Sequence, residues 1–478
     1  MFEKYINFIQ NNSFAKKING FTNSIFYIYT MAIFVIVSNI FALELIGFLL
    51  ITLLLSFALF FNPDTKIILA PILYYQMAFS YLNGLSYNKY PNDPHLFANP
   101  MIQIYLFVLI GIIALSFAFN FFTFKQYKKI LLKSKYVIPG LLVLSIGYML
   151  GGIFSSNYTF NNLLFSLSNV SMIIAMVVYI IDTSFLDNKK IIKYISHLMI
   201  ATIVIISIQL INIYISNNVI RAGEIQKWYI RTGWGIHNNF AGYLCIAYPF
   251  IFYLAKENKK FLLFVPISGL AIAFTLSRNG ILIFAIELII TFIFALKKVK
   301  MSKKNIAITL LISSTFIAFI FVVFHKEIIN LFATMLETGF DFNGRDEIYS
   351  FGINEFINNP VFGSGWFTID KLADESLRSP TNFAPSLKYH NIVIQLLACC
   401  GIFGLLCFIF FIYHITHILL KNKNIGSIIC YLAIIVLIIS SIFDNFFFDY
   451  GFERFLAIFI IGISICKEEK KELLLNNS

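Results

Sequence analysis

The sequence predicts an all-α, polytopic integral membrane protein with about fourteen transmembrane helices and one long external loop. Three features predict this class. Hydrophobic residues occupy 59% of the 478 positions and charged residues only 13%, against about a quarter in an ordinary soluble domain. The mean hydropathy is +0.80. Apolar runs long enough to cross a bilayer recur along the whole chain. This composition excludes a soluble globular protein.

The transmembrane helices are placed by the length that a bilayer requires, which is about 20 apolar residues for each crossing. The run from residue 24 to residue 61 is too long for one span, and Asn39 and Glu44 mark a turn within it. The expected spans lie near 24–41, 43–61, 66–82, 101–123, 136–154, 163–185, 195–216, 236–255, 261–276, 279–296, 306–324, 390–419, 426–443 and 453–466. The expected order of parts is a cytoplasmic N-terminal segment, eleven spans, an external loop with short helices, three spans and a cytoplasmic tail, at 1–23, 24–324, 325–389, 390–466 and 467–478.

The basic residues divide unevenly between the two faces of this topology. With both termini inside, 25 of the 36 lysines and arginines face the cytoplasm, as the positive-inside rule requires. The net charge of +12 therefore reflects topology, and no nucleic-acid partner is needed to explain it. All six arginines fall outside, and they are Arg221, Arg231, Arg278, Arg345, Arg378 and Arg454.

Arginine on the outer face predicts an anion-binding surface, because the planar guanidinium group binds phosphate or carboxylate in a bidentate manner. Solvation or pairing with external acids is the alternative explanation for Arg221, Arg378 and Arg454. Arg278 and Arg345 stand in sequence contexts that favour a functional role.

The external loop at 325–389 contains two features that indicate a site. Asn343–Glu347 and the apolar residues that follow predict a capped amphipathic helix, with Arg345 in its first turn and its end before Pro360. Gly363–Trp366 predicts a flexible turn carrying an aromatic ring, which would suit contact with a sugar. Long structured loops usually carry function.

Arg278 and His390 lie at the outer ends of predicted spans. Thr275–Gly280 forms a tight external turn and places Arg278 at the mouth of the membrane, where the phosphate of a lipid-linked substrate would lie. His390 and Asn391 begin the twelfth span from the outside, and a histidine in such a position can act as a general base. The alternative for His390 is a helix-start residue bonded to neighbouring backbone.

A second histidine shares this arrangement. His237 also begins a span from the outside and follows Arg231, so it is a rival base or an additional sugar contact. His390 is preferred as the base.

The sequence offers no pattern for a metal ion or another cofactor. The outer loops contain no glycine-rich phosphate loop, no His-Glu-x-x-His and no Asp-x-Asp pair. The six cysteines show no metal-ligand spacing and are expected to be packing residues. No cofactor is therefore expected.

Two motifs resemble those of the bacterial O-antigen ligase family, which includes Wzy-type O-antigen and capsule polymerases. Arg278–Leu282 fits R-x-x-x-L, and His390 with Asn391, followed after nine residues by Gly401 and Gly404, fits H-[NSQ]-x9-G-x-x-[GTY]. The likeness extends from about Trp234 to Leu406 and includes Gly344-Arg345, the segment 359–365 and Tyr389. The first 200 residues resemble the family only in hydropathy.

The resemblance implies a GT-C-like helical membrane fold and a metal-independent, inverting glycosyltransferase. Such an enzyme would lie in the bacterial plasma (inner) membrane, with its active site on the external or periplasmic side. Its donor would be a glycan linked to undecaprenyl pyrophosphate, its acceptor a glycan or glycolipid, and a chain-length regulator would be a further partner. Carried over by motif, Arg278 and Arg345 would hold the pyrophosphate, and His390 would deprotonate or orient the acceptor hydroxyl. Further supporting residues would be Asn391, Arg231, His237 and Trp366.

The alternative from another class is a flippase or other transporter of lipid-linked oligosaccharides. Its arginines would lie within the spans, near the middle of the membrane. Here they lie at the outer ends of spans and in the long loop, which favours an enzyme. The sequence leaves open the choice between polymerase and ligase, because both use the same donor chemistry.

Overall fold

The computed structural model describes residues 2–78, 100–185, 188–216, 219–221, 224–225, 227–232, 234–294, 345–372, 387–422 and 424–465, with isolated positions between 304 and 329 and at 385. The described chain forms two compact units. The first contains residues 2–134 and 178–277, and the second contains residues 135–177, 278–294 and 345–465. Most of the predicted span at 306–324, the first part of the predicted external loop, Arg378 and the tail at 467–478 lie outside the described residues.

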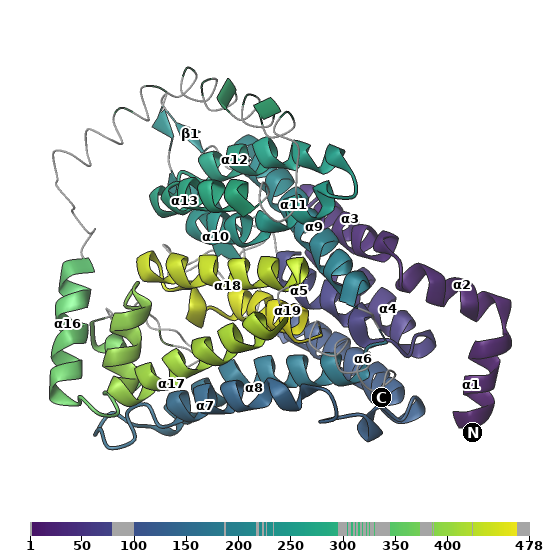
Figure 1. The fold of residues 1–478 in the computed structure, drawn as a ribbon, viewed down its shortest axis with the longest axis horizontal. Helices are drawn as coiled ribbons and strands as arrows, with labels where there is room; N and C mark the ends of the chain where they lie inside the picture. The colour runs from purple at the N-terminus through teal and green to yellow at the C-terminus, as the bar shows by residue number, and fades with distance from the viewer. Residues whose placement is uncertain are drawn as a thin grey trace. The chain divides into compact units, whose positions relative to one another are not determined.

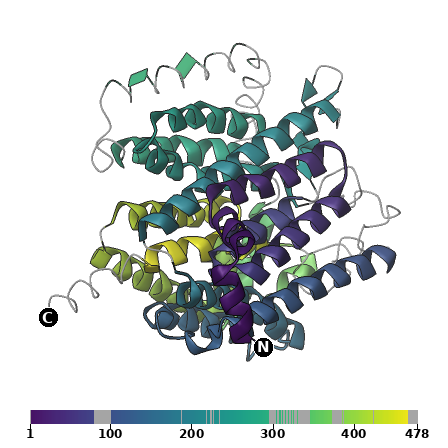
Figure 2. The same cartoon turned by 90° about the vertical axis from the view of Figure 1, so that its right-hand side faces the viewer.

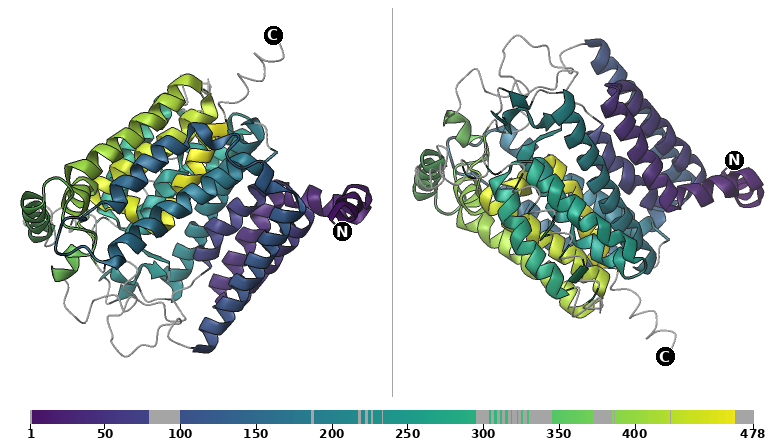
Figure 3. Two further views of the ribbon diagram at one scale, coloured as in Figure 1. Left: turned by 90° about the horizontal axis from the view of Figure 1, so that it is seen from below. Right: turned by 90° about the horizontal axis from the view of Figure 1, so that it is seen from above.

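The first unit is a helical bundle arranged around one long helix, α9 (Asn188–Ser216). This helix packs against α3, α10, α11 and α12 (Figures 1 and 2), and α4 runs beside α6 (Figure 3). The other helices of the unit are α1 (Phe2–Asn11), α2 (Ser13–Thr22), α3 (Ile25–Ile40), α4 (Glu44–Phe61), α5 (Leu69–Met77), α6 (Pro100–Thr123), α10 (His237–Ala247), α11 (Pro249–Ala255) and α12 (Phe264–Phe274). Two antiparallel hairpins of minimal length connect α9 to α10, pairing β1 (Ile220–Arg221) with β2 (Glu224–Ile225) and β3 (Arg231–Thr232) with β4 (Gly235–Ile236).

The described helices confirm an all-α membrane protein. Six of them are long and apolar enough to cross a bilayer, and the bent pair of α2 and α3 would make a seventh crossing. The six lie within α4, α6, α8 (Phe160–Thr183), α9, α17 (Ile392–Asn422) and α18 (Ile425–Phe443). In α6, Phe107 is 71% exposed and Leu115 is 74% exposed. Large apolar side chains exposed to this extent on a helix of this length are suited to contact with lipid. The total of fourteen spans stays a prediction.

A helix that ends at a buried position leaves carbonyl groups that need hydrogen-bond donors, and α5, which ends at the buried residues Met77 and Ala78, shows how the first unit supplies them. The carbonyl of Met77 accepts hydrogen bonds from Asn39 Nδ2 at 3.3 Å and from Gln209 Nε2 at 2.8 Å. Asn39 Nδ2 also donates to the carbonyl of Ala78 at 3.1 Å. Side-chain amides from α3 and α9 thus satisfy the end of α5.

The second unit is built around α17. This helix packs against α7, α16 and α18, while α18 also contacts α13 and α19 (Figure 1). The remaining elements of the unit are α7 (Ile138–Met149), residues 160–177 of α8, α13 (Arg278–Phe294), α16 (Arg345–Asn358), the short 3-10 turns η8 (Thr368–Leu372) and η10 (Phe446–Phe448), and α19 (Tyr450–Ile465). Helix α16 confirms the helix expected in the external loop, since it contains Arg345 in its first turn and ends before Pro360.

Helix α17 is broken at Gly401, whose backbone dihedrals are φ 63° and ψ −165°. The segment that follows α16, residues 360–365, fills the break and is here called the splice loop. Two backbone amides after the break donate hydrogen bonds to carbonyls of this loop, and two backbone amides of the loop donate to carbonyls before the break. The hydrogen bonds run from Ile402 N to Pro360 O (2.9 Å), Phe403 N to Val361 O (3.0 Å), Ser364 N to Ala398 O (2.7 Å) and Gly365 N to Cys399 O (3.0 Å).

The packing of the splice loop into the break of α17 requires glycine in both segments. A Cβ atom on Gly401 would lie 2.4 Å from the carbonyl oxygen of Val361, and one on Gly363 would lie 2.4 Å from the carbonyl carbon of Cys399. Both glycines also have positive φ, which other residues adopt only with strain. The two family-like glycine motifs of the sequence therefore meet in space. Their shared function is to join the end of α16 to the middle of α17.

We expect Gly401→Ala to lower the apparent melting temperature of the purified protein in detergent. The strained backbone costs about 1–3 kcal/mol, and the added methyl group meets backbone atoms that cannot move aside. Gly111→Ala in α6 is the matched control, because nothing lies within 4 Å of an added Cβ there. That control should melt at or slightly above the wild-type temperature, since alanine favours a helix. Equal melting temperatures for Gly401→Ala and wild type would contradict the requirement for glycine where the splice loop meets the break in α17.

Candidate functional site

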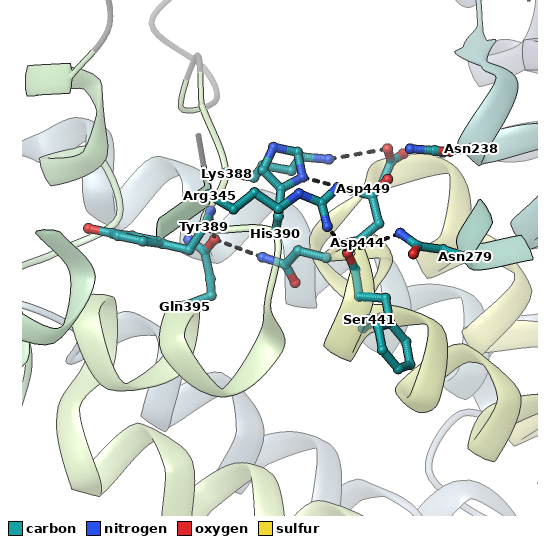
Figure 4. A network of polar contacts seen from close by, with 12 residues as sticks. Asn238, Asn279, Arg345, Lys388, Tyr389, His390, Gln395, Ser441, Asp444 and Asp449 are labelled. Carbon is teal, nitrogen blue, oxygen red and sulfur yellow. Dashed lines mark hydrogen bonds and ion pairs between the residues drawn. The ribbon is translucent and has the colours of Figure 1, made fainter. Parts of the chain in front are cut away.

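The polar residues of the second unit gather on the turn between α18 and α19, residues 443–449 (Figure 4). Phe443 is the last residue of α18, so its carbonyl has no partner within the helix. It accepts hydrogen bonds from Arg345 Nη1 at 2.5 Å and from Asn279 Nδ2 at 3.3 Å. Arg345 begins α16, and Asn279 directly follows Arg278 at the start of α13. One carbonyl at the negative end of a helix dipole therefore binds both arginine-bearing segments.

His390 contacts Asp444 on the same turn. Its Nδ1 lies 2.7 Å from Asp444 Oδ1, and the Asp444 side chain is only 11% exposed. Burial by itself would raise the pKa of Asp444, but the hydrogen bond to His390 and the nearby positive charges of His390, Arg345 and Lys388 together lower it below its usual range. In the neutral form of His390, the ionised carboxylate favours a hydrogen on Nδ1. This leaves Nε2 as the acceptor nitrogen, which is the arrangement that a general base requires.

The backbone around His390 is held in an uncommon conformation. His390 has φ 51°, in the left-handed region that non-glycine residues seldom occupy. Gln395 Oε1 accepts hydrogen bonds from the amide of Tyr389 at 3.1 Å and from Asn445 Nδ2 at 2.7 Å. Lys388 Nζ lies 3.2 Å from Asp449 Oδ2. Residues 388–390 are thus tied to the turn at three successive positions.

Helix α16 is seated against the same segment. A Cβ on Gly352 would lie 2.7 Å from the ring of Tyr389 and 2.7 Å from Ile394, so α16 approaches α17 closely at this glycine. The splice loop then fixes the other end of α16 to the break in α17. These two contacts set the separation of Arg345 from His390.

The structure places the predicted site residues in two groups. Arg345, His390 and the neighbour of Arg278 meet at the turn, as described above. Arg278 is half-buried, and its buried Nε has no hydrogen-bond partner among the described residues. Arg231, in β3, and His237, the first residue of α10, belong to the first unit.

Two supporting residues turn out to hold the fold. Asn391 caps α17, because its Oδ1 accepts hydrogen bonds from the amides of Val393 at 2.9 Å and Ile394 at 3.2 Å. The expectation of an exposed sugar platform at Trp366 is wrong, because this side chain is fully buried. Its indole Nε1 donates to the carbonyl of Tyr148 at 3.1 Å, and its amide donates to Asn162 Oδ1 at 2.6 Å. A ring without an exposed face cannot stack on a sugar.

The acids at this site are not among the residues predicted from the sequence. Asp444 and Asp449 lie in the turn between the last two predicted spans, and no carboxylate partner is predicted for His390 from the sequence. A signal was present in the sequence, since two acids flank a four-residue segment between hydrophobic runs. Five cysteines are described, and all are buried and without disulfide bonds, as the packing interpretation predicts.

This geometry defines a helical membrane protein with arginine, histidine and carboxylate side chains held at the ends of apolar helices. Residues 262–409 match the family model described as O-antigen ligase. The match confirms the predicted resemblance to the O-antigen ligase and Wzy-type family, and it supports a membrane glycosyltransferase-like function in polysaccharide biosynthesis. It includes Arg278, Arg345, His390 and the Gly401 break. No curated protein matches the chain.

We expect His390→Ala to abolish glycan transfer and Asp444→Asn to reduce it roughly 100-fold or more, the scale of a general base and of its orienting carboxylate. Asparagine keeps an acceptor for Nδ1 but removes the charge. Wild type should lose this ionic support only as the pH falls through the lowered pKa of Asp444, whereas the variant lacks it at every pH. The rate with a lipid-linked donor, measured on purified protein, checks both expectations. The control is Glu347→Gln on the exposed side of α16, which should keep wild-type activity.

Proposed function

We propose that the protein transfers a saccharide from undecaprenyl pyrophosphate to an acceptor hydroxyl on the external face of the membrane. The observation that carries this proposal is the contact of His390 Nδ1 with Asp444, next to the Phe443 carbonyl that binds Arg345. The arrangement offers a base and a cation within one small region. The family match supports the same reaction class.

The proposed reaction is a displacement at the anomeric carbon of the donor sugar. Nε2 of His390 accepts the proton of the acceptor hydroxyl, and that oxygen forms a bond to the anomeric carbon of the donor sugar. The bond between the anomeric carbon and the phosphate oxygen breaks, and its electron pair leaves with undecaprenyl pyrophosphate. Attack opposite to the leaving group inverts the anomeric configuration.

Arginine is suited to stabilise the leaving group. A pyrophosphate gains negative charge as the sugar departs, and fixed guanidinium groups stabilise that charge without having to reorganise. Arg345 uses one nitrogen for Phe443 and has further N–H donors for a phosphate. Arg278 starts α13, where its guanidinium would meet a donor arriving from the lipid. In this proposal neither the deprotonation of the acceptor hydroxyl nor the departure of the pyrophosphate requires a metal ion.

The external position of the site is part of the proposal. Residues 345–390 belong to the segment that the distribution of lysine and arginine assigns to the outside. The GT-C-like fold, the fourteen spans and the chain-length regulator as a partner likewise remain proposals. The transporter alternative finds no support in the family match.

Arg345→Lys and Arg278→Lys should each lose at least about ten-fold in transfer rate although the charge is kept, because a point ammonium cannot reproduce bidentate contact with a pyrophosphate. The measurement is the initial rate with the lipid-linked donor at saturating acceptor. Lys371→Arg, at an exposed position of η8, is the control for a change between the two basic residues. Wild-type rates in both arginine variants would remove them from the donor site.

Deletion of the gene separates the two reactions that fit the site. If the protein is a ligase, the deletion strain should accumulate long polymers on undecaprenyl pyrophosphate and none on the final acceptor. If it is a polymerase, the acceptor should still receive single repeat units. The measurement is separate analysis of lipid-linked and surface glycans. Normal long surface glycan, with unprocessed donor on the cytoplasmic leaflet, would contradict both and favour the flippase.

A further inference from the structure

The turn at 443–449 carries two pairs of a basic and an acidic side chain with the same uneven exposure. The Lys388 side chain is 39% exposed and its partner Asp449 is 25% exposed. The His390 side chain is 34% exposed and its partner Asp444 is 11% exposed. In both pairs the basic group is the more accessible one. An anion that approaches the turn therefore meets the basic groups before it meets the acids.

Asp449 is fixed in place by the helix that it begins. Its Oδ1 accepts a hydrogen bond from the amide of Gly451 at 3.0 Å, and its carbonyl accepts from the amides of Phe452 at 2.9 Å and Glu453 at 3.1 Å. These contacts make Asp449 the N-terminal cap of α19. The ion pair with Lys388 is made by the other oxygen, Oδ2, at 3.2 Å. If Lys388 moved and Asp449 moved with it, α19 would lose its N-terminal cap.

Lys388, in contrast, is able to change partners. Its ammonium group stands on a flexible four-carbon stem and has three donors. Its backbone lies two residues before His390, and its charge acts on Asp444 together with those of His390 and Arg345. A half-exposed ion pair of this kind is held only weakly in water. A multivalent anion at the site would compete with Asp449 for the ammonium group.

We propose that Lys388 is a third phosphate-binding residue of the site and that Asp449 is a built-in counter-ion, which a diphosphate displaces. This inference rests on the proposed function, because it assigns the diphosphate to the same turn. On binding, Lys388 Nζ leaves Asp449 Oδ2 and donates to a phosphate oxygen, while Asp449 keeps its cap on α19. No covalent bond changes. When no diphosphate is bound, the carboxylate of Asp449 neutralises the exposed ammonium group of Lys388.

The test is the binding of radiolabelled undecaprenyl pyrophosphate, without a glycan, to the purified full-length protein in detergent. Lys388→Gln should weaken binding roughly ten-fold, because a charge-assisted contact is lost. Asp449→Asn should tighten binding several-fold, roughly the effect of removing one competing charge at a half-exposed site, since asparagine retains the cap oxygen. Lys421→Gln is the matched control, an exposed lysine in the last turn of α17, and it should bind as wild type does.

The opposite signs of the two substitutions distinguish a counter-ion from a structural tether. If the pair only held residues 388–390 to α19, both substitutions would weaken binding, and that result would overturn the proposal. Unchanged binding by Lys388→Gln would overturn it as well. In the double variant Lys388→Gln/Asp449→Asn the gain from Asp449→Asn should disappear, because without Lys388 there is no ammonium group for which the carboxylate and the diphosphate compete.

Arg345→Lys in the same assay separates this inference from the proposed function. If Arg345→Lys weakens binding and Lys388→Gln does not, the donor site stands and only the role of Lys388 fails. If neither variant changes binding, the diphosphate does not bind at this turn, and the donor site of the proposed function fails too. The melting temperature of each variant in detergent shows whether it is folded.

Discussion

A backbone carbonyl at the end or break of a membrane helix needs a hydrogen-bond donor, and the candidate site is assembled from groups that meet this requirement. The carbonyl of Phe443 closes α18 and takes its donors from Arg345 and Asn279. The break at Gly401 takes its partners from the splice loop, which follows α16 directly. Satisfying two interruptions of the helical backbone therefore brings the start of α16, the start of α13 and the start of α17 to one turn.

The electrostatics of the turn follow from the same arrangement. The end of α18 carries the negative pole of a helix dipole, and the start of α19 carries the positive pole. Arg345 binds at the first, and Asp449 caps the second. The two acids of the turn then pair with His390 and Lys388, in each case with the carboxylate less exposed than the base. The result is a surface of basic side chains with carboxylates underneath, which suits an anionic leaving group better than a neutral ligand.

The splice explains why the glycines of the family-like motifs occur where they do. Gly401 and Gly363 lie 38 positions apart in the sequence, yet each would collide with backbone from the other segment if it carried a Cβ. Neither glycine contacts the reacting groups in the proposed mechanism. They act by fixing α16 against α17, and hence the position of Arg345 relative to His390. A motif that reads as a signature of activity is here largely a requirement of backbone packing.

The sequence by itself determined the class of the protein and the residues with distinctive local contexts. Hydropathy predicted helical membrane segments because each span satisfies its own backbone, so its pattern is local. The motifs around Arg278 and His390 and the helix at Arg345 could likewise be recognised from short stretches. The partners of these residues could not be recognised in this way. Arg345 and Phe443 are 98 positions apart, His390 and Asp444 are 54 apart, and Lys388 and Asp449 are 61 apart. Only the packing of α16, α17, α18 and α19 decided these contacts, just as it buried Trp366 and turned Asn391 into a helix cap, because side-chain partners at such separations depend on how helices meet and not on any periodicity along one of them.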